Sequence, residues 1–373
     1  NDCSSDQTSR IDEVIKGVVL INNTSNLRFL KNCNNAAKYA KGKYILFLNN
    51  DTHVQPNWLA PMVDLIEKDK QIGMVGSKLI YPNGTLQEAG GIMWKDGSAW
   101  NYGRGSDPDL PEFNYVKEVD YISGASIMIL RSLWEEIGGF DEEFAPAYCE
   151  DSDLAFTVRK LGYKVMYQPQ SVVVHFEGIS NGRDTASGLK AYQIINQKKF
   201  FDKWKEVLEK EHFDSGTHVF LARDRSRNKK HVLLIDHYVP EYDKDAGSRT
   251  IYHYLKVMSE MGYSVYFIGD NFYRSEPYST ELLQDQICIL FGAYYAQKWK
   301  EWIVENGKYF EYVFINRPHI APKYIDVIRN QTAAKIVYNV CDLRFLREER
   351  EFNITNDITI KERFEENKNT EIS

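Results

Sequence analysis

Short apolar runs alternate with longer stretches of helical spacing along the chain, and this alternation predicts an α/β protein with a mainly parallel sheet. In the first half, the apolar runs are expected strands and the stretches between them are expected helices. The expected strands are residues 18–21, 44–48, 72–76, 78–81, 121–122, 126–130, 164–167 and 172–174. The expected helices are residues 32–41, 56–66, 132–137, 151–161 and 190–212, with Pro56 opening the second one, and residues 101–115 are expected to form a long loop.

The pattern changes after residue 212, which predicts a second domain. Residues 223–230 are basic and contain no apolar side chain, and residues 231–236 then restart the α/β pattern as a strand of buried type. Further expected elements are a helix at 249–261 and strands at 264–268, 287–291, 312–315 and 335–338. The end of the chain is polar and charged, which is typical of a fraying end or a linker. The expected organisation is a first domain 1–215, a basic linker 216–230, a second domain 231–352 and a polar tail 353–373.

Composition narrows the class of protein. The 46 Lys and Arg against 53 Asp and Glu give a net charge of −7 in 373 residues, which argues against a basic face that binds nucleic acid. The apolar runs are far shorter than the roughly 18 residues that a membrane span needs. Five widely spaced cysteines without a Cys-x-x-Cys motif suggest neither a disulfide framework nor a zinc site, so a reducing cytosol is expected. Aromatic residues reach 13%, which fits either stacking on sugars and bases or buried tyrosines.

The expected strand 44–48 stops abruptly at Asn49-Asn50-Asp51-Thr52, and this is the strongest single feature of the sequence. Ligands of open α/β sheets bind at the carboxyl ends of strands, so a carboxylate placed there faces a site. Asp51 is therefore a candidate ligand of Mg²⁺ or Mn²⁺, which take oxygen ligands together with substrate phosphates. The alternative is a turn followed by a helix cap, for which Asn, Asp and Thr are all favoured.

Three carboxylates lie within the four residues Glu150-Asp151-Ser152-Asp153. They repel one another unless a cation or a proton-transfer role compensates, and the alternative is stabilisation by the dipole at a helix start. Consecutive helical residues point about 100° apart, so the three acids are expected to have separate roles. Asp151 with an ordinary pKa near 3.9 would be ionised and ready to accept a proton.

His175 directly follows the apolar strand 172–174. Its position at the carboxyl end of a strand makes it a candidate metal ligand, and we expect it to converge with Asp51 on one cation, because parallel strands bring their carboxyl ends to a common rim. A hydrogen-bonded core histidine is the alternative.

Taken together, these segments resemble family 2 glycosyltransferases in order and spacing. The matching segments are residues 1–6, 48–52, 138–142 and 150–154, together with His175. The resemblance covers about residues 1–215 and implies an inverting, nucleotide-sugar-dependent enzyme of GT-A fold, similar to bacterial rhamnosyltransferase-like enzymes that build O-antigen and other surface polysaccharides. The strand, helix and second strand that normally come first in this family are missing, so the GT-A domain is expected to be incomplete at its N-terminus.

Carried over residue by residue, the resemblance implies a site for a nucleotide sugar and a divalent cation. Asp2 matches the acid that reads the nucleobase. Asn49-Asn50-Asp51 occupies the Asp-x-Asp position with Asn49 in place of the first acid, which leaves Asp51 to bind the metal and the diphosphate. His175 matches the histidine that completes the metal site in some members, and the cation is Mg²⁺ or Mn²⁺.

The resemblance also implies the catalytic pair. Glu150-Asp151 matches the Glu-Asp motif whose Asp is the usual general base, and Glu150 would orient the acceptor or its loop. Ser123 and Gly124 fall where the family lines the sugar pocket, although a Gly in a tight turn explains them equally well.

The second domain resembles, on weaker motifs, the amino-terminal half of a family 4 glycosyltransferase, a Rossmann-like half of the GT-B fold. The motifs are residues 235–240, 243–249, 316–318 and 340–347. The strand, Gly-containing loop and helix start at 235–249 could cradle an anion, and an ordinary βα connection is the alternative. In the GT-B fold the donor sits mainly in the other half, so little transferase activity is expected here, and the chain is expected to be a two-transferase polypeptide cut at both ends.

The sequence therefore predicts transfer of a sugar, with inversion, from a nucleoside diphosphate sugar to a glycan or lipid-linked glycan. The metal held by Asp51 and His175 would neutralise the departing diphosphate, and Asp151 would take the proton of the acceptor hydroxyl. A cytoplasmic location is expected, with peripheral association at the inner face of the cytoplasmic membrane left open. Two other interpretations stay open: a non-catalytic nucleotide- or carbohydrate-binding module, and another metal-dependent, nucleotide-using α/β enzyme.

Overall fold

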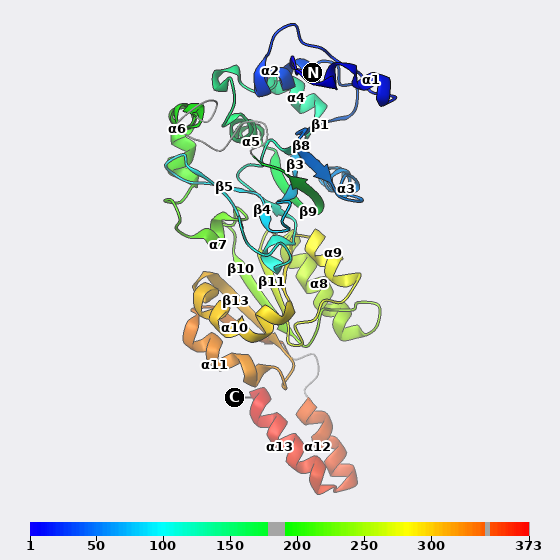
Figure 1. Ribbon diagram of the computed structural model, residues 1–373. Coiled ribbons are helices and arrows are strands. Elements are labelled where there is room, and N and C mark those ends of the chain that lie inside the picture. The colour runs from blue at the N-terminus through cyan, green and yellow to red at the C-terminus, as the bar shows by residue number, and fades with distance from the viewer. Residues whose placement is uncertain (178–190, 340–343, 373) are drawn as a thin grey trace. The chain divides into compact units, whose positions relative to one another are not determined.

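The computed structural model describes residues 1–177, 191–339 and 344–372 (Figure 1). Two compact units make up the chain. The first unit contains residues 1–108 and 117–225, and the second contains residues 109–116 and 226–373. The chain passes from the first unit to the second after Arg225, inside the segment 216–230 where a linker is expected and where the short helix α7 (Val219–Ala222) lies. Both units mix helices and strands, so the α/β class is confirmed.

In the described part of the first unit, seven strands form one mixed sheet. The strands are β1 (Tyr44–Leu48), β2 (Thr52–Val54), β3 (Ile72–Ile80), β4 (Leu86–Glu88), β7 (Lys117–Glu118), β8 (Ser126–Leu130) and β9 (Lys164–His175). Their order is β1-β8-β3-β9-β2, with β4 beside β3 and β7 beside β9, and β5 (Gly91–Met93) pairs with β6 (Ala99–Asn101) separately.

The prediction of a mainly parallel sheet is wrong for this unit. Only the β3–β9 pairing among its described strands is parallel, and the others are antiparallel. Parallel neighbours need a long crossover, which β3 and β9 have, whereas β4 follows β3 through a short turn and returns beside it. Two antiparallel steps through β8 nevertheless leave β1, β3 and β9 running in one direction.

Several expected elements of the first unit differ in extent. The runs 72–76 and 78–81 join as β3, and the runs 164–167 and 172–174 join as β9, because the residues around Pro169 are taken up as a bulge opposite Ser77 and Lys78. Residues 18–21 form no strand, and Val19 is 79% exposed. The helices of this unit are α1 (Ile11–Val14), α2 (Arg28–Ala37), α3 (Ala60–Lys68), α4 (Arg131–Ile137), α5 (Glu150–Lys160), α6 (Ala191–Glu211) and α7.

Two helix starts explain the remaining shifts. Helix α3 begins at Ala60, and the proline in its first turn is Pro61, so the prediction that Pro56 opens this helix is wrong. Helix α2 begins at Arg28, four residues earlier than expected, because a carboxylate distant in sequence caps it, as described below. Residue 190 of the expected helix 190–212 lies outside the described residues.

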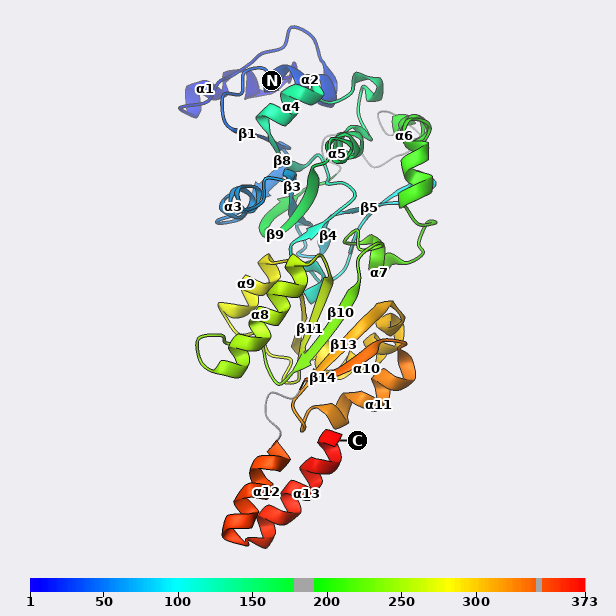
Figure 2. The same cartoon turned by 180° about the vertical axis from the view of Figure 1, so that it is seen from behind.

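The second unit contains a parallel five-stranded sheet, as expected. Its order is β12-β11-β10-β13-β14, built from β10 (His231–Asp236), β11 (Ser264–Gly269), β12 (Cys288–Leu290), β13 (Phe310–Asn316) and β14 (Lys335–Asn339). Figures 1 and 2 agree that α8 (Ala246–Glu260) and α9 (Tyr278–Gln284) cover one face, and that α10 (Gly292–Asn306) and α11 (Ala321–Gln331) cover the other. Strand order reverses beside β10, which is the type of position where open α/β sheets bind ligands.

The polar end of the chain is helical. Helices α12 (Arg344–Thr355) and α13 (Ile358–Ile372) pack as a hairpin, with Phe352 and Phe364 5.8 Å apart between ring centroids. The expected fraying end or linker is thus an ordered pair of helices, because a few apolar side chains at helical spacing suffice to join two amphipathic helices. Of the helices in the described ranges, none combines the length and the apolar character that a membrane span requires.

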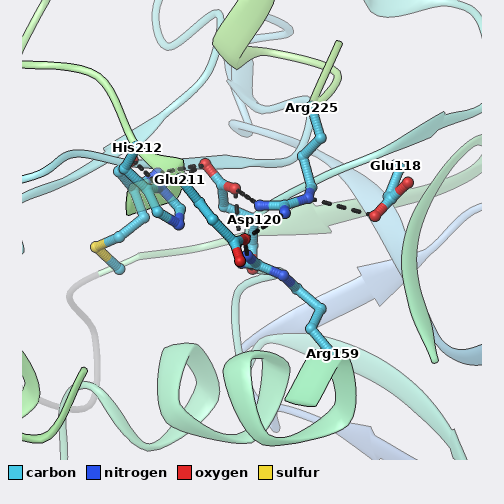
Figure 3. A network of polar contacts seen from close by, with 7 residues as sticks. Glu118, Asp120, Arg159, Glu211, His212 and Arg225 are labelled. Carbon is cyan, nitrogen blue, oxygen red and sulfur yellow. Dashed lines mark hydrogen bonds and ion pairs between the residues drawn. The ribbon is translucent and has the colours of Figure 1, made fainter. Parts of the chain in front are cut away.

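In the first unit, a buried network of charged side chains joins Asp120 to Arg159 of α5, Glu211 of α6 and Arg225 (Figure 3). The Asp120 carboxylate pairs with the guanidinium of Arg225, lies 3.6 Å from that of Arg159, and accepts the Met93 N–H at 3.0 Å. Both arginines also reach Glu211 at the end of α6, at 3.0 and 3.1 Å. Burial opposes ionisation of Asp120, but the positive groups around it outweigh burial and hold its pKa below the ordinary value. The network therefore fastens α5 and α6 to the sheet around one ionised carboxylate.

We expect Asp120→Asn to lower the free energy of unfolding by about 3–5 kcal/mol, since it removes the buried negative charge that the two guanidinium groups share. Urea unfolding followed by tryptophan fluorescence measures this change. The control is Glu135→Gln, which removes an exposed partner of Arg131 and should change the free energy by less than about 0.5 kcal/mol. Equal effects of the two substitutions would contradict the role given to Asp120.

Candidate functional site

A cavity of about 1100 Å³ opens in the first unit. Its walls come from the N-terminal segment, α2, β1 with the loop that follows it, and the end of β9. Five of the residues singled out from the sequence line this cavity: Asp2, Asn49, Asn50, Asp51 and His175. Glu150, Asp151, Ser123 and Gly124 are not among its lining residues, although Phe29 of the lining would lie 3.4 Å from a Cβ placed on Gly124.

Asp51 and His175 lie side by side, as the sequence predicts. His175 Nε2 is 3.3 Å from Asp51 Oδ1, and both side chains are mostly buried. The antiparallel pairing of β2 with β9 holds them together, with Thr52 opposite His175 and the Phe176 N–H bonded to the Asp51 carbonyl at 2.9 Å. The expectation that parallel strands bring the two residues to a common rim is only partly correct. Strands β1 and β9 do run in the same direction. The direct link, however, is made by β2, which is antiparallel to β9.

The hydrogen bonds around His175 orient its ring so that Nε2 faces Asp51. Gln87 donates through Nε2 to Glu177 Oε2 at 3.1 Å, which turns its Oε1 toward His175 Nδ1 at 3.2 Å. With this assignment Nδ1 carries a proton, so Nε2 of the neutral ring presents a lone pair to the Asp51 carboxylate. Two acceptors at 3.3 Å need a proton or a metal ion between them, and the imidazole–carboxylate set suits a divalent cation.

The protein supplies few ligands at this position. Within the described ranges, no three or more His, Cys, Asp or Glu residues gather as a metal site. Asp51 and His175 are the two side chains here that could hold a cation, and its other ligands would have to be water and phosphate oxygens.

The segment before Asp51 is a turn. Thr52 donates through Oγ1 to the Asn49 carbonyl at 2.6 Å, and the Asn49 N–H bonds to the Ala125 carbonyl at 3.0 Å. Strand β2 follows this turn, so the alternative of a helix cap at these residues is wrong. Asn50 is exposed and lines the cavity.

Asp2 lines the cavity while its carboxylate holds α2 in place. It accepts the N–H of Leu27 at 2.7 Å and of Arg28 at 2.8 Å, and it accepts the side-chain amide of Asn23 at 2.9 Å. The contact with a nucleobase stays a prediction, and the capping of a helix is the observed role.

The three acids at the start of α5 have separate partners. Asp151 accepts the Gly124 N–H on Oδ2 at 3.0 Å and the Ser152 N–H on Oδ1 at 2.7 Å. Asp153 faces α6, where it accepts the Trp204 indole N–H at 2.7 Å and pairs with Lys203. The buried Glu150 has an Oε2 atom without a hydrogen-bond partner. Asp153 is therefore bound up in packing, and Asp151 points to the turn at Gly124.

The prediction of an ordinary pKa for Asp151 is wrong. Burial raises the pKa of Asp151 above its usual value, although the N–H groups of Gly124 and Ser152 oppose this shift. Burial, and then the neighbouring charge of Asp151, also raise the pKa of Glu150. A raised pKa makes Asp151 a stronger base than a surface aspartate.

Sequence reasoning missed Gln87, Glu88 and Glu177. Glu177 accepts from Tyr81, Gln87 and Arg104, and the pKa of its carboxyl is about 2, because these donors outweigh its burial. Glu177 comes two residues after His175, so the end of the strand was a usable signal. Gln87 and Glu88 lie on the three-residue strand β4, where no local pattern marks them.

Part of the first unit matches a known protein family. Residues 1–137 match the profile described as "Glycosyl transferase family 2". The N-terminal region carries a glycosyl transferase family 2 domain. Asn49-Asn50-Asp51 lies inside the matched part of the family 2 domain, whereas Asp151 and His175 follow it in sequence.

Two named relatives are similar to part of this chain. The chain is 33% identical over 156 residues to "O-antigen biosynthesis protein RfbC" of Myxococcus xanthus, a match that covers 40% of this chain and 12% of the relative. It is 27% identical over 160 residues to an "N-acetylglucosaminyl-diphospho-decaprenol L-rhamnosyltransferase" of Mycobacterium tuberculosis, covering 40% of this chain and 52% of the relative. The chain thus spans well under two thirds of the length of either relative.

Solved structures of glycosyltransferases are similar at a low level. "GalNAc-T7 with UDP, GalNAc and Mn2+" has a TM-score of 0.44 and 17% identity, and the match covers 58% of this chain and 44% of that one. "TarS 1-349 in complex with UDP" from S. aureus has a TM-score of 0.34 and 16% identity over 59% of this chain and 63% of that one. Values below 0.5 establish no common fold.

We expect Glu150→Gln to raise the melting temperature, and to raise it more at pH 8 than at pH 5. The unfolded chain loses the Glu150 proton near the ordinary pKa of 4.5, whereas the folded chain keeps it to higher pH. At Glu150 the unfolded state therefore binds fewer protons in this window, and the contribution of this residue to stability falls as the pH rises above about 4.5. Glutamine removes that dependence. Thermal melts at both pH values measure it, with the exposed Glu136→Gln as the control that should show no such widening.

Proposed function

We propose that the first unit is an inverting, metal-dependent glycosyltransferase domain of GT-A type. It moves a sugar from a nucleoside diphosphate sugar to a glycan or lipid-linked glycan in the synthesis of a cell-surface polysaccharide. The observation that carries this proposal is that Asp51 Oδ1 and His175 Nε2 lie 3.3 Å apart on the wall of a large cavity, with Asp51 inside the family 2 match. The named functions of the relatives, O-antigen biosynthesis and rhamnosyl transfer, support the same class of acceptor.

The donor would lie in the cavity with its diphosphate at Asp51 and His175. Its nucleoside would extend toward Asp2 and α2, which form the other wall. A bound Mg²⁺ or Mn²⁺ would neutralise charge on the diphosphate leaving group. The task of Asp51 and His175 is to fix that cation, and the task of Gln87 is to keep the His175 proton on Nδ1, so that Nε2 stays available.

Asp151 would act as the general base. Inversion by a single displacement needs one base, which takes the proton of the acceptor hydroxyl as its oxygen attacks the anomeric carbon and the bond to the diphosphate breaks. The N–H groups of Gly124 and Ser152 hold the carboxylate in place, and its raised pKa favours proton uptake. Glu150, buried beside it, would support the acceptor side.

A binding module without catalysis is the second candidate. It is favoured by Asn49 at the position of the first acid, since an amide binds a metal less strongly than a carboxylate does. Turnover of any nucleotide sugar separates the two candidates.

The second unit would be a Rossmann-like half of GT-B type that acts on the acceptor side. Its parallel sheet and the reversal of strand order beside β10 support this assignment. The motif 340–347 carries less weight, because residues 340–343 lie outside the described part of the chain. We place the enzyme in the cytoplasm, with nucleotide sugar and acceptor as its partners and with association at the inner face of the membrane.

We expect Asp151→Asn to lower kcat by about 10²- to 10⁴-fold with donor binding largely kept, because the amide keeps the shape but accepts no proton. The assay is release of nucleoside diphosphate from a panel of nucleotide sugars with Mn²⁺ and a glycan acceptor. The control is Asp153→Asn, which loses an anchor of α6 and should mainly lower the melting temperature. Near-normal turnover of Asp151→Asn, together with its loss in Glu150→Gln, would reverse the two assignments.

We expect His175→Gln to weaken Mn²⁺ binding in the presence of a nucleoside diphosphate by at least about tenfold, and Gln87→Leu by about 10- to 100-fold. Isothermal titration calorimetry measures both affinities. His53→Gln is a matched control, because His53 lies on the same strand pair but is exposed and is absent from the cavity lining. If His53→Gln weakens Mn²⁺ as much as His175→Gln does, the metal is bound elsewhere.

A further inference from the structure

Glu88 is a buried acid that the proposed donor and metal contacts leave unexplained. It ends β4, its side chain has no exposed surface, and its Oε1 accepts the Ser123 N–H at 3.1 Å. Its Oε2 has no hydrogen-bond partner. Burying a carboxyl group with one oxygen unpartnered lowers stability, so the position calls for a compensating role.

The Ser123 N–H that Glu88 accepts belongs to the turn 123–125, which makes two other polar contacts. The next N–H, that of Gly124, is bonded to Asp151 Oδ2, and the carbonyl of Ala125 accepts the Asn49 N–H. Three consecutive residues of one turn therefore contact Glu88, the proposed base and the start of the Asn49–Asp51 segment. A displacement of this turn would move Asp151 relative to the donor site.

We propose that Glu88 is a positioning residue of the transfer reaction, which fixes the turn 123–125 through Ser123 and thereby sets the place of the Asp151 carboxylate. The inference rests on the proposed function, because it takes Asp151 as the base. Glu88 acts only through the turn, since its side chain is fully buried and reaches no substrate.

The chemistry of a carboxyl at this place is consistent with that role. Burial, assisted by the nearby charge of Asp151, raises the pKa of Glu88 to about 8, so the group is mostly neutral at pH 7. A neutral acid accepts the Ser123 N–H without placing a second negative charge beside Asp151. Glutamine imitates this neutral acid in shape and keeps the acceptor, whereas methionine keeps the volume but offers no oxygen.

The test compares Glu88→Met with Glu88→Gln in the 373-residue chain. We expect Glu88→Met to lower kcat by about 10- to 100-fold, because small misplacements of a catalytic group have effects of this size. The KM for the donor and the binding of nucleoside diphosphate with Mn²⁺ should stay within about threefold, and Glu88→Gln should keep kcat within about threefold. Glu88→Ala replaces the methionine variant if the latter does not fold.

Two results would overturn the proposal: Glu88→Met with kcat within about threefold of wild type, or Glu88→Gln as impaired as Glu88→Met. Amide hydrogen exchange of the peptide around residues 120–126 gives a readout that needs no turnover. Faster exchange in Glu88→Met but not in Glu88→Gln supports the hold on the turn, and unchanged exchange in both overturns it. If wild type turns over no nucleotide sugar, the proposed function fails, and the exchange result still decides whether Glu88 holds the turn.

Discussion

The backbone of one turn, Ser123 to Ala125, is the constraint on which the site of the first unit depends. Backbone N–H and C=O groups must find partners, and here they find them in three different elements of the chain. Glu88 and Asp151 accept from the turn, and Asn49 donates to it. Residues that lie far apart in sequence are thereby held in a fixed relation without direct contact between their side chains.

Helix α6 supplies the second constraint. Tyr148 and Cys149, directly before the Glu-Asp pair, have positive φ values of 79° and 69°, which residues with side chains adopt at an energetic cost. The buried Asn196 of α6 compensates, since its side-chain amide donates to the carbonyls of Phe144, Ala147 and Tyr148 at 2.7, 2.9 and 3.1 Å. The acid pair is therefore presented by a strained segment that α6 locks in place, which makes α6 part of the site although it lies beyond the residues matched to the family.

The sequence predicted correctly those strands that are buried on both faces of a sheet. The strand 231–236 has the expected bounds, because a strand covered on both sides by helices is apolar throughout. Two separate strands, 164–167 and 172–174, were predicted where β9 is continuous, since a bulge takes up Pro169 and the strand continues to His175. Asp51 and His175 were correctly brought together, but the antiparallel pairing that joins them depends on tertiary contacts. The raised pKa of Asp151 and the role of Glu88 could not be predicted, because both arise from burial by residues distant in sequence.

The buried acids Glu88 and Glu150 lower the stability of this part of the molecule, and burial raises the basicity of its carboxyl groups. Glu88 and Glu150 each keep one carboxyl oxygen without a hydrogen-bond partner, and both lie close enough to Asp151 for its charge to raise their pKa values. A core selected for stability alone would replace such groups with apolar side chains. The acids around Asp151 that burial keeps protonated do not neutralise its carboxyl group as a salt-bridge partner would, and burial raises the pKa of Asp151 itself. The local loss of stability thus accompanies a raised pKa of Asp151, which makes this carboxylate more basic than one on the surface.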